Sequence, residues 1–182
     1  MLRDTASDGK TTVLNRVAAN AGGLRVSAGD FLDRLAQGAP IAMEEAFVEM
    51  IREALATTDL LLIDDLNRIR DVACDKCNNP RSGLFDVALA SVLDQATSSG
   101  KKLVFATDSA PLPLRHRAHA WVIEDFQAAD YEVICSAYLD PAIARRMNFD
   151  EIHPFAPSLN ANQFRKAAEW LAQESGRYGS RT

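Results

Sequence analysis

A glycine, a lysine and two threonines stand together near the start of the chain, as Gly9-Lys10-Thr11-Thr12. Apolar residues recur at helical spacing directly after them, over residues 11–21. A glycine at a helix start lets the backbone approach a phosphate, and the helix N-terminus then presents amide N–H groups to that charge. We therefore interpret residues 9–12 as a phosphate-binding loop, in which Lys10 reaches the β- and γ-phosphates and Thr11 ligates Mg²⁺.

A pair of acids, Asp64 and Asp65, directly follows the apolar run Leu60-Leu61-Leu62-Ile63. A short apolar run bounded by turn residues is typical of a strand that is covered on both faces of a parallel sheet. A carboxylate at the end of such a strand can hold magnesium and its water, so we predict Asp64 as a metal ligand. Asp65 is placed to orient or deprotonate an attacking water. The alternative interpretation is a solvated turn after a buried strand.

The spacing of apolar residues also predicts the strands and helices that position these residues. A second apolar run, over residues 103–106, ends in Thr107-Asp108-Ser109 and predicts another strand. Strands that alternate with helices predict a doubly wound parallel sheet, which is an α/β fold. The other expected strands cover residues 24–26 and 120–123, and the expected helices cover residues 11–21, 43–56 and 84–96.

The pattern changes after Phe126. Helical patterns follow one another with no strand between them, over residues 131–139, 142–147 and 160–173. We therefore predict a nucleotide-binding core over residues 1–126 and a small all-helical subdomain over residues 127–182.

This order of parts resembles the AAA+ family of P-loop ATPases, and the resemblance covers most of the chain. It implies a parallel sheet flanked by helices and followed by a helical lid. It also implies ATP and Mg²⁺ as cofactors, and an ATPase that couples hydrolysis to the remodelling of a partner macromolecule, here an unknown protein. Thr107, at the tip of the third strand, resembles the family's first sensor, and its neighbours Asp108 and Ser109 are placed to share that role.

The resemblance extends to three arginines. Arg115 and Arg117 stand just before the expected last strand, where the family places an arginine finger that completes a neighbouring subunit's site. The alternative is a solvated basic turn. Arg165 resembles the second sensor, early in a helix of the lid. An arginine finger implies a homo-oligomer, as a ring or a helical assembly.

The chain departs from the family pattern in its first residues. Asp4 stands where the loop's first glycine is expected, and Asp8, directly before Gly9, adds negative charge close to the phosphates. Only residues 1–3 precede Asp4, too few for a central strand of usual length. We therefore expect the strand before the loop to be absent, which indicates a truncated chain, a misplaced start or a gap filled by another chain. The Asp-Asp pair occurs in the family branch of bacterial replication initiators and helicase loaders.

Composition bounds the remaining functions. The chain has 182 residues, of which 47% are hydrophobic and 25% charged, values of an ordinary globular protein. A net charge of −5 and a pI near 5.2 give no support for a broad nucleic-acid surface. No apolar run approaches the roughly 20 residues that span a bilayer, so we expect no membrane partner and a cytoplasmic location. Cys74 and Cys77 are more typical of free thiols than of half a zinc site.

Three alternatives stay open at this stage. A P-loop kinase would share the phosphate loop but transfer the phosphoryl group to an acceptor. A degenerate, non-hydrolysing nucleotide-binding domain kept as an interaction scaffold would explain Asp4 and Asp8. A helicase-loader-like protein would hydrolyse ATP faster with single-stranded DNA.

Overall fold

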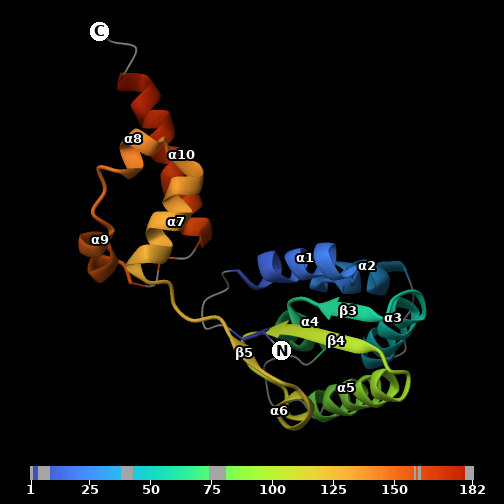
Figure 1. The fold of residues 1–182 in the computed structure, drawn as a ribbon. Coiled ribbons are helices and arrows are strands. Elements are labelled where there is room, and N and C mark those ends of the chain that lie inside the picture. The colour runs from blue at the N-terminus through green and yellow to red at the C-terminus, as the bar shows by residue number, and fades with distance from the viewer. Residues whose placement is uncertain are drawn as a thin grey trace. The chain divides into compact units, whose positions relative to one another are not determined.

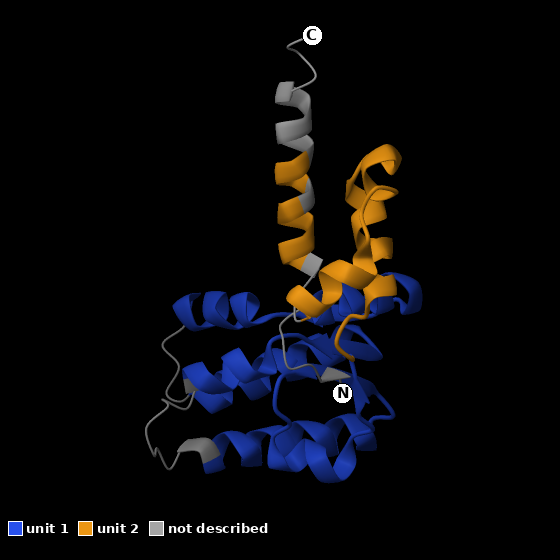
Figure 2. Cartoon of the chain, turned by 90° about the vertical axis from the view of Figure 1, so that its left-hand side faces the viewer, with its two compact units in different colours: residues 1–5, 9–123 blue, residues 6–8, 124–182 orange. Residues whose placement is uncertain are grey.

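The computed structural model describes residues 2–3, 9–37, 43–73, 81–157, 159 and 161–178 (Figure 1). The described residues form two compact units, one up to Ile123 and one from Glu124 onward (Figure 2). The sequence features at Asp4, Asp8, Cys74 and Cys77 lie outside the described residues.

The first unit alternates strands and helices along the chain. Within the described residues, five strands form one parallel sheet in the order β2-β3-β4-β1-β5. The predicted fold class, a parallel α/β sheet flanked by helices, is therefore confirmed. The elements are β1 (Leu2–Arg3), α1 (Lys10–Ala21), β2 (Leu24–Val26), α2 (Ala28–Gln37), α3 (Met43–Thr57), β3 (Leu60–Ile63), α4 (Leu66–Ala73), α5 (Arg81–Ser98), β4 (Lys102–Thr107), α6 (Leu112–Arg117) and β5 (Trp121–Val122).

The expectation that the strand before the phosphate loop is absent is wrong. Residues 2–3 form β1, which pairs with β4 on one side and β5 on the other. Leu2 lies opposite Ala106 in β4 and Trp121 in β5. The expectation relied on the usual strand length of about 5–6 residues, whereas a shorter strand held between two neighbours has ladder partners on both edges.

The two faces of the sheet bury alternate residues of β3, as the two-residue period of a strand requires. Leu61 and Ile63 belong to the larger core, which also contains residues of α2 to α6. Leu62 points to the opposite face and packs with Leu14 of α1 and Ala106 of β4. Figure 1 shows α1 and α5 on opposite sides of the sheet. Covering on both faces explains why the run 60–63 is apolar throughout.

Helix α2 was not predicted, although the sequence contains its start signal. The Ser27 amide and hydroxyl donate to the Asp30 carboxylate, at 2.8 and 2.6 Å, and the Asp30 amide lies 3.3 Å from the Ser27 hydroxyl. This reciprocal bonding satisfies amides that a helix start otherwise leaves unpaired. The hydrogen bonds from Ser27 lower the pKa of Asp30 below its ordinary value. Helices α4 and α6 were likewise not predicted.

The second unit is helical in its described residues. It contains α7 (Ala128–Tyr138), α8 (Pro141–Ala144), α9 (Phe149–Phe155) and α10 (Ala161–Tyr178), of which α9 was not predicted. Its core is a cluster of six buried residues: Tyr131, Cys135, Leu139, Ala144, Phe149 and Phe164. The role of this unit as a nucleotide lid, and its functional boundary at residue 126, stay predictions. None of the described helices is long and apolar enough to cross a membrane.

Candidate functional site

The sheet brings the predicted chemical residues to one edge. Strands β1 and β3 both flank β4, with Arg3 opposite Thr107 and Ile63 opposite Phe105. All three strands run parallel, so their carboxyl ends meet at the same edge. Ligands of open parallel sheets bind outside the carboxyl ends of the strands. We call this place the carboxyl edge; Lys10, Asp64 and Asp108 gather there.

Gly9 shapes the start of α1. Its φ of 118° lies in the region that favours glycine, and a Cβ built on Gly9 would meet no atom within 4 Å. Backbone conformation, rather than crowding, therefore requires the glycine. The Gly9 carbonyl accepts the Val13 amide at 2.8 Å, so the amides before Val13 have no acceptor within the helix. Such amides suit an anion, and the open space at Gly9 leaves room for one to approach.

Lys10 is buried at the carboxyl edge. Only 6% of the residue is exposed, and its ammonium forms an ion pair with the Asp108 carboxylate. The other Asp108 oxygen accepts the side-chain amide of Asn67 at 2.9 Å. A buried ammonium needs a compensating charge, and within the chain Asp108 supplies it. The arrangement suits an anion that replaces Asp108 as the partner of Lys10.

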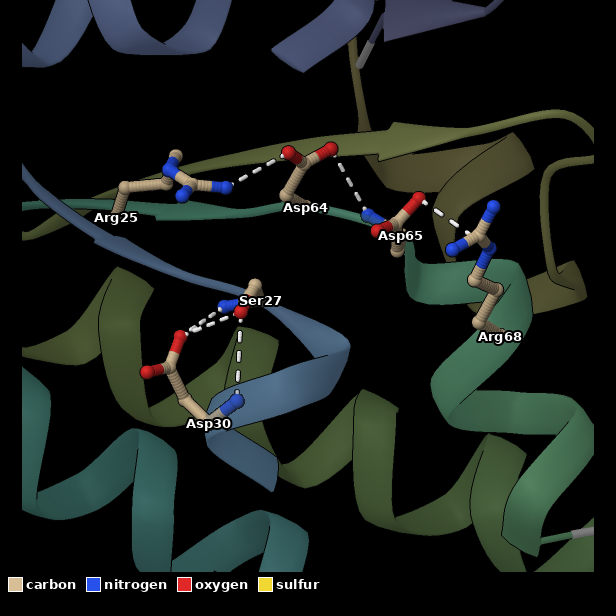
Figure 3. A network of polar contacts seen from close by, with 6 residues as sticks. All are labelled: Arg25, Ser27, Asp30, Asp64, Asp65 and Arg68. Atoms are coloured by element: carbon tan, nitrogen blue, oxygen red, sulfur yellow. Dashed lines mark hydrogen bonds and ion pairs between the residues drawn. The ribbon is translucent and has the colours of Figure 1, made fainter. Parts of the chain in front are cut away.

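Asp64 directly follows β3, the strand that pairs with β4, and is 1% exposed. Its Oδ2 accepts a hydrogen bond from Arg25 of β2 at 2.9 Å, and its Oδ1 accepts the Asp65 amide at 3.0 Å (Figure 3). Each carboxylate oxygen has two lone pairs, so these two bonds leave acceptor capacity on Asp64. Arg25 was not singled out in the sequence, because a lone arginine in a short strand carries no pattern.

Asp65 adopts a left-handed backbone conformation, with φ of 53°, the one positive φ among the described non-glycine residues. Its carbonyl accepts the amides of Arg68 and Ile69, at 2.8 and 3.1 Å, which begins α4. Its carboxylate lies 3.8 Å from the Arg68 Nε. Such a conformation costs a non-glycine residue about 1–3 kcal/mol, and positions of this kind cluster at functional sites.

Thr107 ends β4 and is fully buried. Its hydroxyl donates to the Ser109 carbonyl at 2.8 Å, which closes the turn after the strand. The residue that meets Lys10 is Asp108, the next along the chain. Asp108 was predicted only as a neighbour of Thr107, from its position at the end of the apolar run. Asn67 was not predicted, because the position of α4 in the fold, and no sequence pattern, brings it to Asp108.

The donors present fit Mg²⁺ in type. Thr11 and Thr12 are exposed in the first turn of α1, and Asp64 supplies a carboxylate at the same edge. Within the described residues, no three His, Cys, Asp or Glu side chains are grouped to hold a metal. Magnesium needs no such group, because it keeps several waters and uses one or two carboxylates together with substrate phosphates.

The predicted arginines each have a described contact with another part of the chain. The Arg115 Nε donates to the Ala110 carbonyl at 2.8 Å, and Arg117 forms a 2.5 Å ion pair with Asp94 of α5. Arg165 lies on α10 in the second unit, 3.9 Å from Glu169. The structure therefore pairs Lys10 with Asp108 and Asp64 with Arg25 at the carboxyl edge, and it leaves the roles of the arginines as predictions.

Comparisons with known proteins were made by sequence and by structure. No protein-family model matches the chain, and no curated protein sequence matches it. Several solved structures do match the chain in fold. Domain III of the replication initiation protein DnaA from Thermotoga maritima aligns over 100% of this chain and 78% of its own, with a TM-score of 0.63 and 18% identity.

Two further DnaA structures align over 94% of this chain. DnaA from Aquifex aeolicus bound to AMPPCP gives a TM-score of 0.56 at 17% identity, and DnaA bound to AMPPCP and single-stranded DNA gives 0.57 at 16%. This chain spans 54% of the length of each. At such identities the likeness shows the fold alone, which this chain shares with these DnaA structures.

Proposed function

We propose that this chain is an AAA+-type ATPase module, which binds Mg-ATP and couples its hydrolysis to the remodelling of a partner macromolecule. The observation that carries the proposal is the carboxyl edge. There a buried lysine at a glycine-led helix start pairs with Asp108 after β4, and the buried Asp64 follows β3, the strand next to β4. The AAA+ fold and the AMPPCP in two similar structures agree with it.

Each residue has a role in this proposal. The first-turn amides of α1 and the Lys10 ammonium bind the phosphates. Asp108 gives up its contact with Lys10 when the phosphates arrive and stays bonded to Asn67. Thr11 and Asp64 would hold magnesium, which neutralises charge on the phosphates. Asp65 orients or deprotonates the attacking water, and Thr107, Asp108 or both sense the γ-phosphate.

Assembly is the second part of the proposal. Arg115 or Arg117 completes the site of a neighbouring copy, and Arg165 acts as the second sensor from the helical unit. Because Arg117 is paired with Asp94 and only the Nε of Arg115 has a hydrogen bond described, Arg115 is the preferred finger. Sedimentation with ATP tests this part. We expect oligomers of the wild type and unchanged assembly with lost hydrolysis in Arg115→Ala, whereas a monomeric wild type contradicts it.

A non-hydrolysing nucleotide-binding scaffold is the second candidate. It is favoured by one observation: Lys10 and Asp64 both have oppositely charged partners within the chain, so the edge is charge-compensated without a ligand. In that case, the fold presents a surface to a partner and nucleotide acts only as a structural ligand.

Phosphate release from ATP separates these functions. The wild type should release phosphate with Mg²⁺, and Asp65→Asn should lower kcat by about 100-fold or more while nucleotide binding persists. Binding without release by the wild type selects the scaffold. Phosphate found on an added acceptor selects a kinase, and acceleration by single-stranded DNA selects a helicase-loader-like role.

A further inference from the structure

Arg25 is a cation at the carboxyl edge that the proposed mechanism does not use. It is the middle residue of β2, opposite Leu62 of β3 in the sheet register. Asp64 follows β3, and its amide donates to the Val26 carbonyl at 2.8 Å. This backbone bond holds the end of β3 against β2, and the long Arg25 side chain reaches the Asp64 carboxylate (Figure 3).

The contact is close and largely shielded from water. The Arg25 Nη1 lies 2.9 Å from the Asp64 Oδ2, and the exposed fractions of the two side chains are 32% and 2%. An opposite charge at this distance interacts far more strongly in a buried place than in bulk water. The negative charge of Asp64 is therefore already balanced by a cation of the chain itself.

We propose that Arg25 competes with the divalent cation for Asp64, and so sets the metal requirement of the nucleotide site. This inference rests on the proposed nucleotide function. Arg25 and a hydrated divalent ion repel each other, and both need an oxygen of the same carboxylate. The Asp64 Oδ1 is held by the Asp65 amide at 3.0 Å, so the competition centres on Oδ2. Metal binding at Asp64 therefore requires Arg25 to leave or to share that oxygen.

Competition has a signature that simple charge neutralisation lacks. Without divalent metal, Arg25 adds positive charge near the phosphates, so its removal weakens nucleotide binding. With metal, its removal exposes Asp64 to the ion, so half-saturation occurs at a lower Mg²⁺ concentration. The two curves of binding against Mg²⁺ therefore cross. A residue that only stabilised the fold would shift binding in one direction at every metal concentration.

The experiment is a magnesium titration of nucleotide binding. A fluorescent ATP analogue is held at fixed concentration in EDTA, and MgCl₂ is added at constant ionic strength. For Arg25→Met we expect weaker binding in EDTA and a midpoint for Mg²⁺ about tenfold lower than in the wild type. Arg25→Gln, which keeps a hydrogen-bond donor for Asp64, should show the same direction and covers the case in which the Met variant unfolds.

Arg34→Met is the matched control. Arg34 is about as exposed as Arg25 and also pairs with carboxylates, but those of Glu49 and Glu53 are 52% and 66% exposed, whereas Asp64 is 2% exposed. Removal of Arg34 lowers the net charge by the same amount and should leave the magnesium midpoint where the wild type has it. A midpoint that shifts equally in both variants would show a general charge effect and overturn the competition.

The remaining outcomes separate this inference from the proposed function. Nucleotide binding with an unchanged or higher magnesium midpoint in both Arg25 variants overturns the inference and leaves the function standing. If neither the wild type nor any variant binds the analogue, the proposed function fails. The competition at Asp64 is then tested by thermal unfolding with Mg²⁺ alone. A larger stabilisation of the Arg25 variants than of Arg34→Met then supports competition at Asp64, and equal stabilisation overturns it.

Discussion

The carboxyl edge and the core of the helical unit bury different kinds of group. At the edge, Lys10 and Asp64 are buried with their charges, each beside an oppositely charged partner. In the helical unit, the described core is apolar apart from Tyr131 and Cys135. The Tyr131 hydroxyl donates to the Ala156 carbonyl at 2.6 Å and accepts the Leu159 amide at 3.2 Å.

Under the proposed function, this difference separates positions that act in chemistry from positions that pack the core. Buried ion pairs are weak evidence of stability, because desolvation offsets most of the attraction between the charges. Each pair at the edge has one buried partner, Lys10 or Asp64, and the proposed function gives that buried charge a charged ligand to bind. The Tyr131 hydroxyl, by contrast, stabilises the end of α9 through hydrogen bonds between uncharged groups. The comparison predicts large effects of single changes at the edge and smaller ones elsewhere.

The largest loss of stability should follow Arg25→Met. The change leaves the Asp64 carboxylate buried without its cation, which typically costs about 3 kcal/mol. Urea denaturation of the variant and the wild type measures the loss. Arg34→Met, which breaks an exposed pair, should lie close to the wild type. Equal losses of stability in the two variants would contradict the predicted difference between the carboxyl edge and the surface.

A smaller effect is expected for Gly9→Ala. The φ of 118° at Gly9 is unfavourable for alanine and should cost about 1–2 kcal/mol, with weaker nucleotide binding. Gly83→Ala in α5 is the matched change, because Gly83 is exposed and its Cβ also meets open space. It should stabilise the protein by about 0.5 kcal/mol. Destabilisation of the same size in both variants would argue against a special conformation at Gly9.

Tyr131→Phe sharpens the comparison from the other side. It keeps the ring in the core but removes the hydroxyl that bonds the Ala156 carbonyl and the Leu159 amide. Only the long 3.4 Å bond between these two groups then remains, so we expect a cost of about 1 kcal/mol. Nucleotide binding should not change. Denaturation followed by far-ultraviolet circular dichroism measures the loss, and an unchanged midpoint would show that water replaces the hydroxyl.

The smallest effect should come from Asp30→Asn at the start of α2. Losing the charged cap should cost about 0.5 kcal/mol at neutral pH. The folded pKa of Asp30 is lowered from 3.8 by the hydrogen bonds from Ser27, so the carboxylate's contribution is complete above 3.8 and is lost as pH falls through the folded pKa. The difference in free energy of unfolding between Asp30→Asn and the wild type should therefore become smaller at acidic pH. A difference that is constant down to the lowest pH would exclude this cause.

The strands that carry the site were predictable from sequence because their runs are apolar and end in acids. Residues 60–63 form β3 as predicted, and the run 103–106 lies within β4. Strand β1 was missed because two residues carry too little pattern. Helix α2 was missed although Ser27 and Asp30 have the spacing of a capping box, a local signal that was present and not used.

The pairing of charges at the edge was not predictable in this way. Lys10 and Asp108 are 98 residues apart, and Arg25 and Asp64 are 39 apart, so only the strand order brings them together. A sequence pattern identifies Lys10 by its neighbours, but it has no means of naming the partner. The same limit applies to Asn67, which reaches Asp108 through the position of α4.

Nucleotide binding that depends on Lys10 tests the central claim most directly. A fluorescent ATP analogue is titrated with Mg²⁺ into the wild type, Lys10→Ala and Lys102→Ala, the last being a control at an exposed lysine where β4 begins. We predict saturable binding by the wild type and Lys102→Ala, and an affinity at least about tenfold weaker in Lys10→Ala. Equal affinity in all three proteins, or no binding by a folded wild type, would contradict a nucleotide site at the carboxyl edge.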